Sequence, residues 1–137
     1  MYPKYILELI KDNKLEEALN YLFNLIKKHP FDTVSFNDIG YLLVNMGNYD
    51  EAISYLNIAL NYSKIDNEII CRPTIFLNLA VSYKLKGDVE NSDDSYLKAK
   101  NNIDEYFKLI KNNNDSNYQQ AMELEKQLKN KFQFTNI

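Results

Sequence analysis

Histidine and cysteine, two residue types that often carry chemistry, occur once each in this sequence, as His29 and Cys71. A zinc site needs about four His, Cys or carboxylate ligands at defined spacing, and neither residue has such neighbours. A catalytic nucleophile would have to use His29 as its base. His29 follows two lysines and precedes Pro30, which is typical of a helix end, where an imidazole complements the helix dipole. We therefore expect neither a metal site nor a catalytic base.

Cys71 has two interpretations. Arg72 is adjacent, and a neighbouring cation favours the reactive thiolate, so a redox-sensing cysteine is one of them. The other is a small apolar side chain packed beneath a loop beside Ile69 and Ile70. A lone cysteine next to apolar residues is more typical of packing.

Four carboxylates cluster in one short stretch, at Asp88, Glu90, Asp93 and Asp94. The cluster could bind Ca²⁺ or a basic partner, but it lacks the central glycine and the terminal glutamate of a calcium loop. Carboxylates are favourable in the first turns of any helix. Phosphate cradles need clustered glycines, and the three glycines here are isolated. We expect no cofactor, no metal and no enzymatic activity.

The composition is that of one folded domain. The chain has 137 residues, of which 45% are hydrophobic and 26% charged. Its net charge of -3 argues against a nucleic-acid or anionic-membrane binder, which needs a concentrated positive surface. The single cysteine cannot form an intramolecular disulfide, and residues 1–25 show no signal pattern or long apolar run. We expect a cytoplasmic protein.

Three glycines and three prolines are few for this length, so the chain should be mostly helix with short connections. Apolar residues recur at three- and four-residue steps, as buried helical stripes do. Capping boxes are expected at Asn13 with Glu16, at Asn48 with Glu51 and at Ser116 with Gln119, and Asp88 is a weaker cap. The expected helices are 2–11, 15–28, 33–46, 49–63, 73–86, 88 to about 102 or further, and 117–132.

The sequence repeats itself. A shift of 34 residues places Ala18 on Ala52, and a further shift of 40 places Gly47 on Gly87. Three helical hairpins are therefore expected, with about six residues inserted before the third.

The repeat resembles the tetratricopeptide repeat, whose signature orders large apolar, small and aromatic positions. The middle repeat matches best, at Phe36, Ile39, Gly40, Leu43, Gly47, Tyr49, Ala52, Leu56, Ala59 and Leu60. The first repeat keeps Leu9, Leu15, Ala18, Leu22, Leu25 and Pro30. The third has Phe76, Leu79, Ala80, Tyr83, Gly87, Val89, Tyr96 and Ala99, but carries Ser92 where alanine is usual.

This resemblance implies a single domain over 1–137, a right-handed α-solenoid of about three hairpins plus a C-terminal capping helix. The repeats would cover about 1–32, 33–72 and 73–103, with an extension and cap over 104–137. Small residues at Gly40, Ala52, Ala80 and Ala99 would allow close helix contacts, and aromatic residues would fill the wedge between layers. Gly47 and Gly87 should adopt left-handed backbone angles, with Asn13 as the next best choice.

Beyond residue 103 the resemblance weakens, and two readings stay open. Either the sixth helix continues through Ile103, Phe107 and Ile110 as a long strut, or it breaks near Asn101 and begins a degenerate fourth hairpin. In both cases the last helix would present Tyr118, Ala121, Leu124, Leu128 and Phe132 on one side and charges on the other.

In the family, the first helix of each hairpin lines a concave groove. The side chains that line this groove should point away from the wedge and form an exposed apolar trough. The positions expected to contact a partner are Leu7, Ile10, Lys11, Val34, Asn37, Asp38, Tyr41, Val44, Asn45, Leu77, Asn78, Val81 and Lys84. Members that clamp chaperone carboxylates use lysine, asparagine and arginine there. This chain has Pro3, Leu7, Asp38, Thr74 and Asn78 at the matching places, so the clamp is absent.

The resemblance therefore predicts a non-enzymatic scaffold, an adaptor or chaperone-like module that binds a partner peptide or helix in a mainly apolar groove. The alternative is a structural self-association unit, a homodimer whose groove is filled by its own C-terminus or by a second copy. Neither reading involves nucleic acid or a membrane.

Overall fold

The computed structural model describes residues 3–65, 71–109, 119, 122–123 and 126, apart from the side chains of residues 106, 107 and 109. This part of the chain confirms the all-α expectation. Its helices are α1 (Lys4–Lys11), α2 (Leu15–Lys28), α3 (Thr33–Asn45), α4 (Tyr49–Ile65), α5 (Cys71–Lys86) and α6 (Val89–Leu109).

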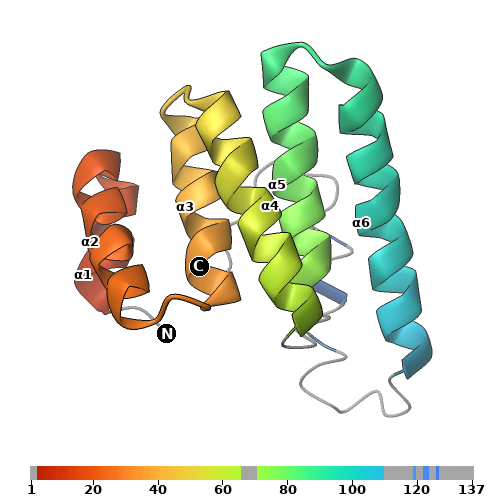
Figure 1. Cartoon of the computed structure of the whole chain (residues 1–137), viewed down its shortest axis with the longest axis horizontal. Coiled ribbons are helices and arrows are strands. Elements are labelled where there is room, and N and C mark those ends of the chain that lie inside the picture. The colour runs from red at the N-terminus through yellow and green to blue at the C-terminus, as the bar shows by residue number, and fades with distance from the viewer. Residues whose placement is uncertain (1–2, 66–70, 110–118, 120–121, 124–125, 127–137) are drawn as a thin grey trace.

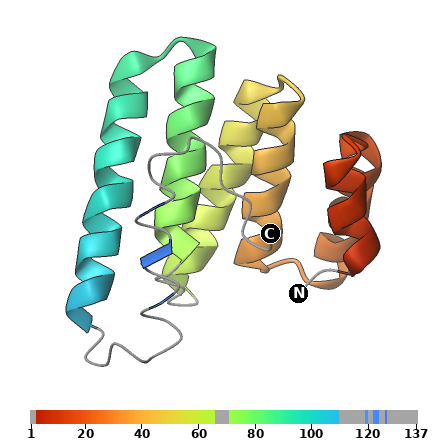
Figure 2. The ribbon, with the colours of Figure 1, turned by 180° about the vertical axis from the view of Figure 1, so that it is seen from behind.

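The six helices pack sequentially in pairs, as three hairpins of a tetratricopeptide-like solenoid do. α1 packs on α2, α3 on α4 and α5 on α6, and the hairpins join through α2 with α3, α4 with α5, and α3 with α5. The helices α2 and α4 lie nearer the viewer in Figure 1, whereas α1, α3 and α5 lie nearer in Figure 2, which shows the molecule from behind. We call α1, α3 and α5 the inner layer, and their side opposite α2 and α4 the inner face.

The same turn closes each hairpin. The left-handed residue is Asn13 (φ 59°) in the first turn, Gly47 (φ 84°) in the second and Gly87 (φ 97°) in the third, as predicted. In each turn, the next N–H donates to a carbonyl five residues back. These bonds are Lys14 N to Leu9 O (2.8 Å), Asn48 N to Leu43 O (2.9 Å) and Asp88 N to Tyr83 O (2.8 Å).

The expected capping box at Asn13 is wrong. The N-cap of α2 is Lys14, and no side chain caps this helix. The turn that ends α1 already needs Asn13 in the left-handed conformation, so Asn13 cannot also begin α2. Asp88 does cap α6, because its Oδ1 accepts the Asn91 N–H at 3.2 Å and its Oδ2 accepts the Asn91 side-chain amide at 2.7 Å. Ser116 lies outside the described residues.

Small residues allow close helix contacts, as expected. Ala52, Ala80 and Ala99 are fully buried. A Cβ added to Gly40 would lie 2.5 Å from Cγ and Cδ2 of Leu56. Ser92 fits at a usual alanine position because its buried hydroxyl donates to the Ala80 carbonyl at 2.8 Å.

Aromatic rings connect the layers in a continuous series. Phe36 of α3 lies between two tyrosines of α4, with ring centroids 6.1 Å from Tyr55 and 5.4 Å from Tyr62. Tyr55 continues to Phe23 of α2 at 5.8 Å, and Tyr62 to Phe31 at 5.4 Å. These rings fill the space between the first two hairpins, as predicted for the wedge positions.

The third hairpin differs from expectation at the start of α5, whereas the end of α6 was left open by the sequence. α5 begins at Cys71 and not at residue 73, because Pro73 is tolerated within the first turn of a helix. α6 runs without a break to Leu109, which supports the strut over a break near Asn101. Ile103 is buried on this helix. Ile110 and most of the expected helix 117–132 lie outside the described residues.

Candidate functional site

The inner layer brings together most of the side chains expected to line a groove. Seven of them keep contact with solvent. Leu7, Ile10, Val34 and Tyr41 are half-buried and pack against the core around Ile6. Lys11, Asn45 and Lys84 are exposed at the helix ends.

The other six are buried, and they are Asn37, Asp38, Val44, Leu77, Asn78 and Val81. Val44 and Val81 belong to the same core cluster as Leu42 and Leu43. The expectation that these six side chains form an exposed trough is therefore wrong. α3 packs directly on α5, so positions assigned to the groove are shared with the contact between hairpins. Whether any of the thirteen positions contacts a partner stays a prediction.

A buried amide pair links α3 and α5. The Asn78 side-chain N–H donates to the Asn37 Oδ1 at 3.1 Å, and the Ser82 hydroxyl donates to the Asn78 carbonyl at 2.7 Å. The Asn37 Nδ2 is also buried, but it has no hydrogen-bond partner within the described part of the chain, and the same holds for the Thr33 hydroxyl one turn earlier. An unpaired buried donor is costly, so this point of the inner face favours an added acceptor.

Tyr41 lies beside this pair on α3. Burial raises the pKa of its phenol above the ordinary value of 10.0, the hydrogen bond with the Asn45 side chain lowers it, and the negative charge of Asp38 raises it. The Asn45 amide donates to the Tyr41 carbonyl at 2.9 Å. Tyr41 is therefore a neutral, partly exposed aromatic residue at neutral pH, well suited to contact apolar groups.

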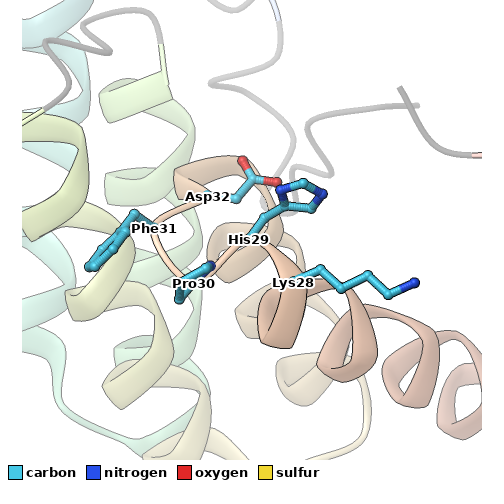
Figure 3. Close-up of a pocket in the computed structure, with 5 residues that line it drawn as sticks. All are labelled: Lys28, His29, Pro30, Phe31 and Asp32. Carbon is cyan, nitrogen blue, oxygen red and sulfur yellow. The ribbon is translucent and has the colours of Figure 1, made fainter.

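A separate hollow of about 550 Å³ lies at the turn between α2 and α3, lined by Lys28, His29, Pro30, Phe31 and Asp32. Figure 3 shows His29 and Asp32 close together, with Phe31 pointing away from them. The Asp32 carboxylate accepts the Ser35 hydroxyl at 2.6 Å, and the Phe31 ring packs on Tyr62. The lining offers no serine, threonine or cysteine nucleophile. His29 follows the last residue of α2, the helix end expected from the sequence.

The other chemical candidates have structural roles. Cys71 is buried beside Leu56 and Ala59 in the second core cluster, which fits the packing interpretation. Arg72 reaches back to α4, where its Nη2 donates to the Ser63 carbonyl at 3.2 Å. In the acidic cluster, Asp94 pairs with Lys98 at 2.9 Å, one turn further along α6.

Two features are absent from the residues that the structure describes. In 3–65, 71–109 and the isolated positions beyond, no group of three His, Cys, Asp or Glu side chains is placed to hold a metal ion. None of the helices in this part of the chain is both long and apolar enough to cross a membrane.

The sequence did not reveal the roles of Thr33 and Ser82, or the hollow at residues 28–32. The only available signal for the amide pair was that Asn37 and Asn78 occupy neighbouring positions of two repeats. Periodicity does not show that two such side chains meet across a helix contact.

Comparison with known proteins identifies the middle hairpin. A family model described as the tetratricopeptide repeat matches residues 34–66, which span nearly all of α3 and the whole of α4. A comparison with curated proteins found no match. The chain thus contains a tetratricopeptide repeat, a unit that is generally non-catalytic and typical of protein–protein interaction modules.

Proposed function

We propose that this protein is a non-enzymatic cytoplasmic adaptor or chaperone-like scaffold that binds a peptide or helix of a partner protein in a concave groove formed by its inner face. The observation that carries the proposal is the stack of three hairpins, whose middle member matches the tetratricopeptide repeat. Stacked hairpins of this kind form extended binding surfaces.

The chemistry of the inner face favours a mostly apolar partner segment. Leu7, Ile10, Val34 and Tyr41 offer partly exposed apolar surface. The unpaired Asn37 Nδ2 suits a backbone carbonyl of a bound peptide. The six buried positions of the predicted set would contact the partner only where the partner reaches the contact between α3 and α5.

Charged side chains should contribute little to binding of the partner. Lys11 and Lys84 lie at helix ends, and Asp38 is the only acidic residue among the predicted positions. Binding should therefore depend weakly on salt, because screening acts mainly on concentrated exposed charge.

The test places a photo-crosslinking phenylalanine derivative at Tyr41 of the full chain in native lysate. The matched control carries the same group at Tyr62, a tyrosine of α4 that is also half-buried. The proposal expects one partner segment crosslinked from position 41 and not from position 62. Crosslinks from position 62 alone would contradict it, and crosslinks from position 41 to a second copy would support the homodimer instead.

The crosslinked segment can then be synthesised and its affinity measured by calorimetry. Tyr41→Ala should weaken binding by about 1 to 2 kcal/mol, since buried aromatic anchors dominate such contacts. Tyr62→Ala, which truncates a tyrosine of similar exposure in the outer layer, should leave the affinity unchanged. Equal losses in the two variants would remove the inner face from the proposal.

A further inference from the structure

The second hairpin stacks on the first through three positions of the repeat. Ile39 and Leu43 of α3 are buried in the core cluster that also contains buried residues of α1 and α2. On α4, the Tyr55 ring centroid lies 5.8 Å from the centroid of the Phe23 ring of α2. These three positions therefore receive the hairpin that precedes them in the stack.

The first hairpin carries apolar residues at the same three positions, but there they keep contact with solvent. The repeat shift of 34 residues equates them with Tyr5, Leu9 and Tyr21. Tyr5 is 52% exposed, whereas Ile39 at the equivalent position is fully buried, and Leu9 and Tyr21 are half-buried. The Tyr5 and Tyr21 rings meet edge to face, with centroids 5.7 Å apart. We call the surface formed by Tyr5, Leu9 and Tyr21 the end face.

The end face belongs to the hairpin at one end of the row of helices. Figures 1 and 2 both show α1 and α2 at that end, with the other two hairpins on their opposite side. A terminal hairpin normally has a polar outer surface, because no hairpin stacks on it. Two adjoining tyrosines and a leucine at stacking positions therefore indicate a surface that receives another apolar surface.

The opposite end of the row does not complement the end face. Leu19 and Ile26 of α2 pack in the cores that the first hairpin shares with the second. The two repeat shifts equate these positions with Asp93 and Lys100 of α6, and both are exposed. Stacking the end face of one copy on α6 of another would bury these charges, and it would continue as an open filament.

The charges on α2 favour a second end face as the occupant. Glu17 and Lys28 are exposed and lie on the same side of α2 as Tyr21, which is four residues from one and seven from the other. A two-fold axis midway along α2 runs this helix antiparallel to its copy. Glu17 of each copy then faces Lys28 of the other, and Tyr21 lies within one helical turn of the axis.

We infer that the end face binds the end face of a second copy and forms a two-fold symmetric dimer. A contact between two identical surfaces closes at two copies, so the dimer does not grow further. The row of three hairpins then continues across the axis as a row of six. The inference does not depend on the proposed function, because the inner face is a different surface and the dimer carries two of them.

The first test is sedimentation velocity of the full chain, without any partner, at concentrations up to about 0.1 mM. Tyr5→Glu places like charges near the axis in both copies at an exposed position, and circular dichroism checks the fold. Leu97→Glu is the matched control, because Leu97 is an exposed apolar residue of α6 at the other end of the row, 57% exposed.

The inference expects a dimer with a dissociation constant of about 1 to 100 μM, as for a small interface. Tyr5→Glu should raise this constant at least about tenfold, and Leu97→Glu should leave it unchanged. A chain that stays monomeric would overturn the inference. So would a dimer that is insensitive to Tyr5→Glu, or assemblies beyond the dimer that Leu97→Glu dissolves.

The second test exchanges charges on α2 and does not alter the apolar contact. Glu17→Lys or Lys28→Glu alone should raise the dissociation constant about threefold, because each creates two like-charge contacts across the axis. The double variant should restore the original value. These residues are about 16 Å apart along one helix, so restoration must come from contacts between copies. A double variant that binds no better than the single variants would contradict the two-fold arrangement.

Discussion

Gly40 lies at the closest contact between α3 and α4. A methyl group there would lie 2.5 Å from the Cγ and Cδ2 atoms of Leu56, a fully buried side chain that has little room to move. Helix propensity alone favours alanine over glycine by about 1 kcal/mol, whereas overpacking a core costs about 1 to 3 kcal/mol. Packing should therefore decide whether alanine at position 40 raises or lowers the free energy of unfolding.

We predict that Gly40→Ala lowers the free energy of unfolding by about 1 kcal/mol in the wild-type background. In a Leu56→Ala background the clash is absent, so the same substitution should raise the free energy of unfolding by up to about 1 kcal/mol. Urea titration of the four proteins gives both values. Equal effects in the two backgrounds would show that Gly40 does not meet Leu56 as described.

Tyr96 of α6 has a buried hydroxyl with no hydrogen-bond partner within the described residues. Tyr96→Phe should leave the free energy of unfolding at neutral pH unchanged or raise it by up to about 1 kcal/mol, because no bond is lost. The control is Tyr5→Phe at an exposed position, which should have no effect. A clear loss of stability with Tyr96→Phe would reveal a hidden partner of the hydroxyl.

The same residue gives a prediction in alkaline solution. Burial raises the pKa of the Tyr96 phenol above 10.0, the positive charge of Lys84 lowers it, and Asp93 raises it. Above pH 10 the unfolded chain therefore loses this proton before the folded chain does, so stability falls as pH rises. Tyr96→Phe should make this fall less steep, as urea titrations at several alkaline pH values would show. An unchanged slope would mean that Tyr96 ionises equally in both states.

At the residue scale, backbone requirements were predictable and side-chain pairing was not. Asn13, Gly47 and Gly87 were assigned left-handed angles because few residues tolerate them. The role of Asn13 as a helix cap was wrong because a capping pattern and a turn pattern competed for one residue. The Ser92 and Asn37 hydrogen bonds depend on atoms far apart in the chain, which residue type alone does not locate.

At the scale of helices, Ala52 tests the repeat register. It is fully buried in α4, so Ala52→Leu should lower the free energy of unfolding by about 1 to 3 kcal/mol through overpacking. Asn57→Leu introduces the same side chain at an exposed position of α4 and should do little. Thermal and urea unfolding would measure both, and a change within about 0.5 kcal/mol for Ala52→Leu would contradict the assigned close contact.

Helix positions followed from glycines, caps and apolar spacing, but two helix ends did not. α5 includes Cys71 and Arg72 ahead of Pro73, which is tolerated in the first turn of a helix, and Arg72 also donates to the Ser63 carbonyl of α4, a tertiary contact that the sequence does not show. α6 continues past Asn101 to Leu109, where the sequence allowed either a strut or a break. Ile103 is buried on this part of α6, and such tertiary packing cannot be read from the helix propensity of the local sequence.

For the whole molecule, the repeat predicted the order of packing, because Ala18 recurs as Ala52 and Gly47 recurs as Gly87, at fixed positions of similar hairpins. The candidate site was predicted less well. Repeat position identifies which helices share a face, but Val81 and Leu77 are buried there, and burial depends on everything that packs nearby. Single-sequence patterns cannot separate a groove position from a contact between adjacent hairpins.

The claim that the inner face binds a partner segment is tested most directly by hydrogen exchange of the intact chain, with and without the peptide identified by crosslinking. The account predicts that the peptide slows amide exchange in α3 and α5 and leaves α2 and α4 unchanged. Protection confined to α2 and α4, or to the turn at residues 28–32, would contradict it.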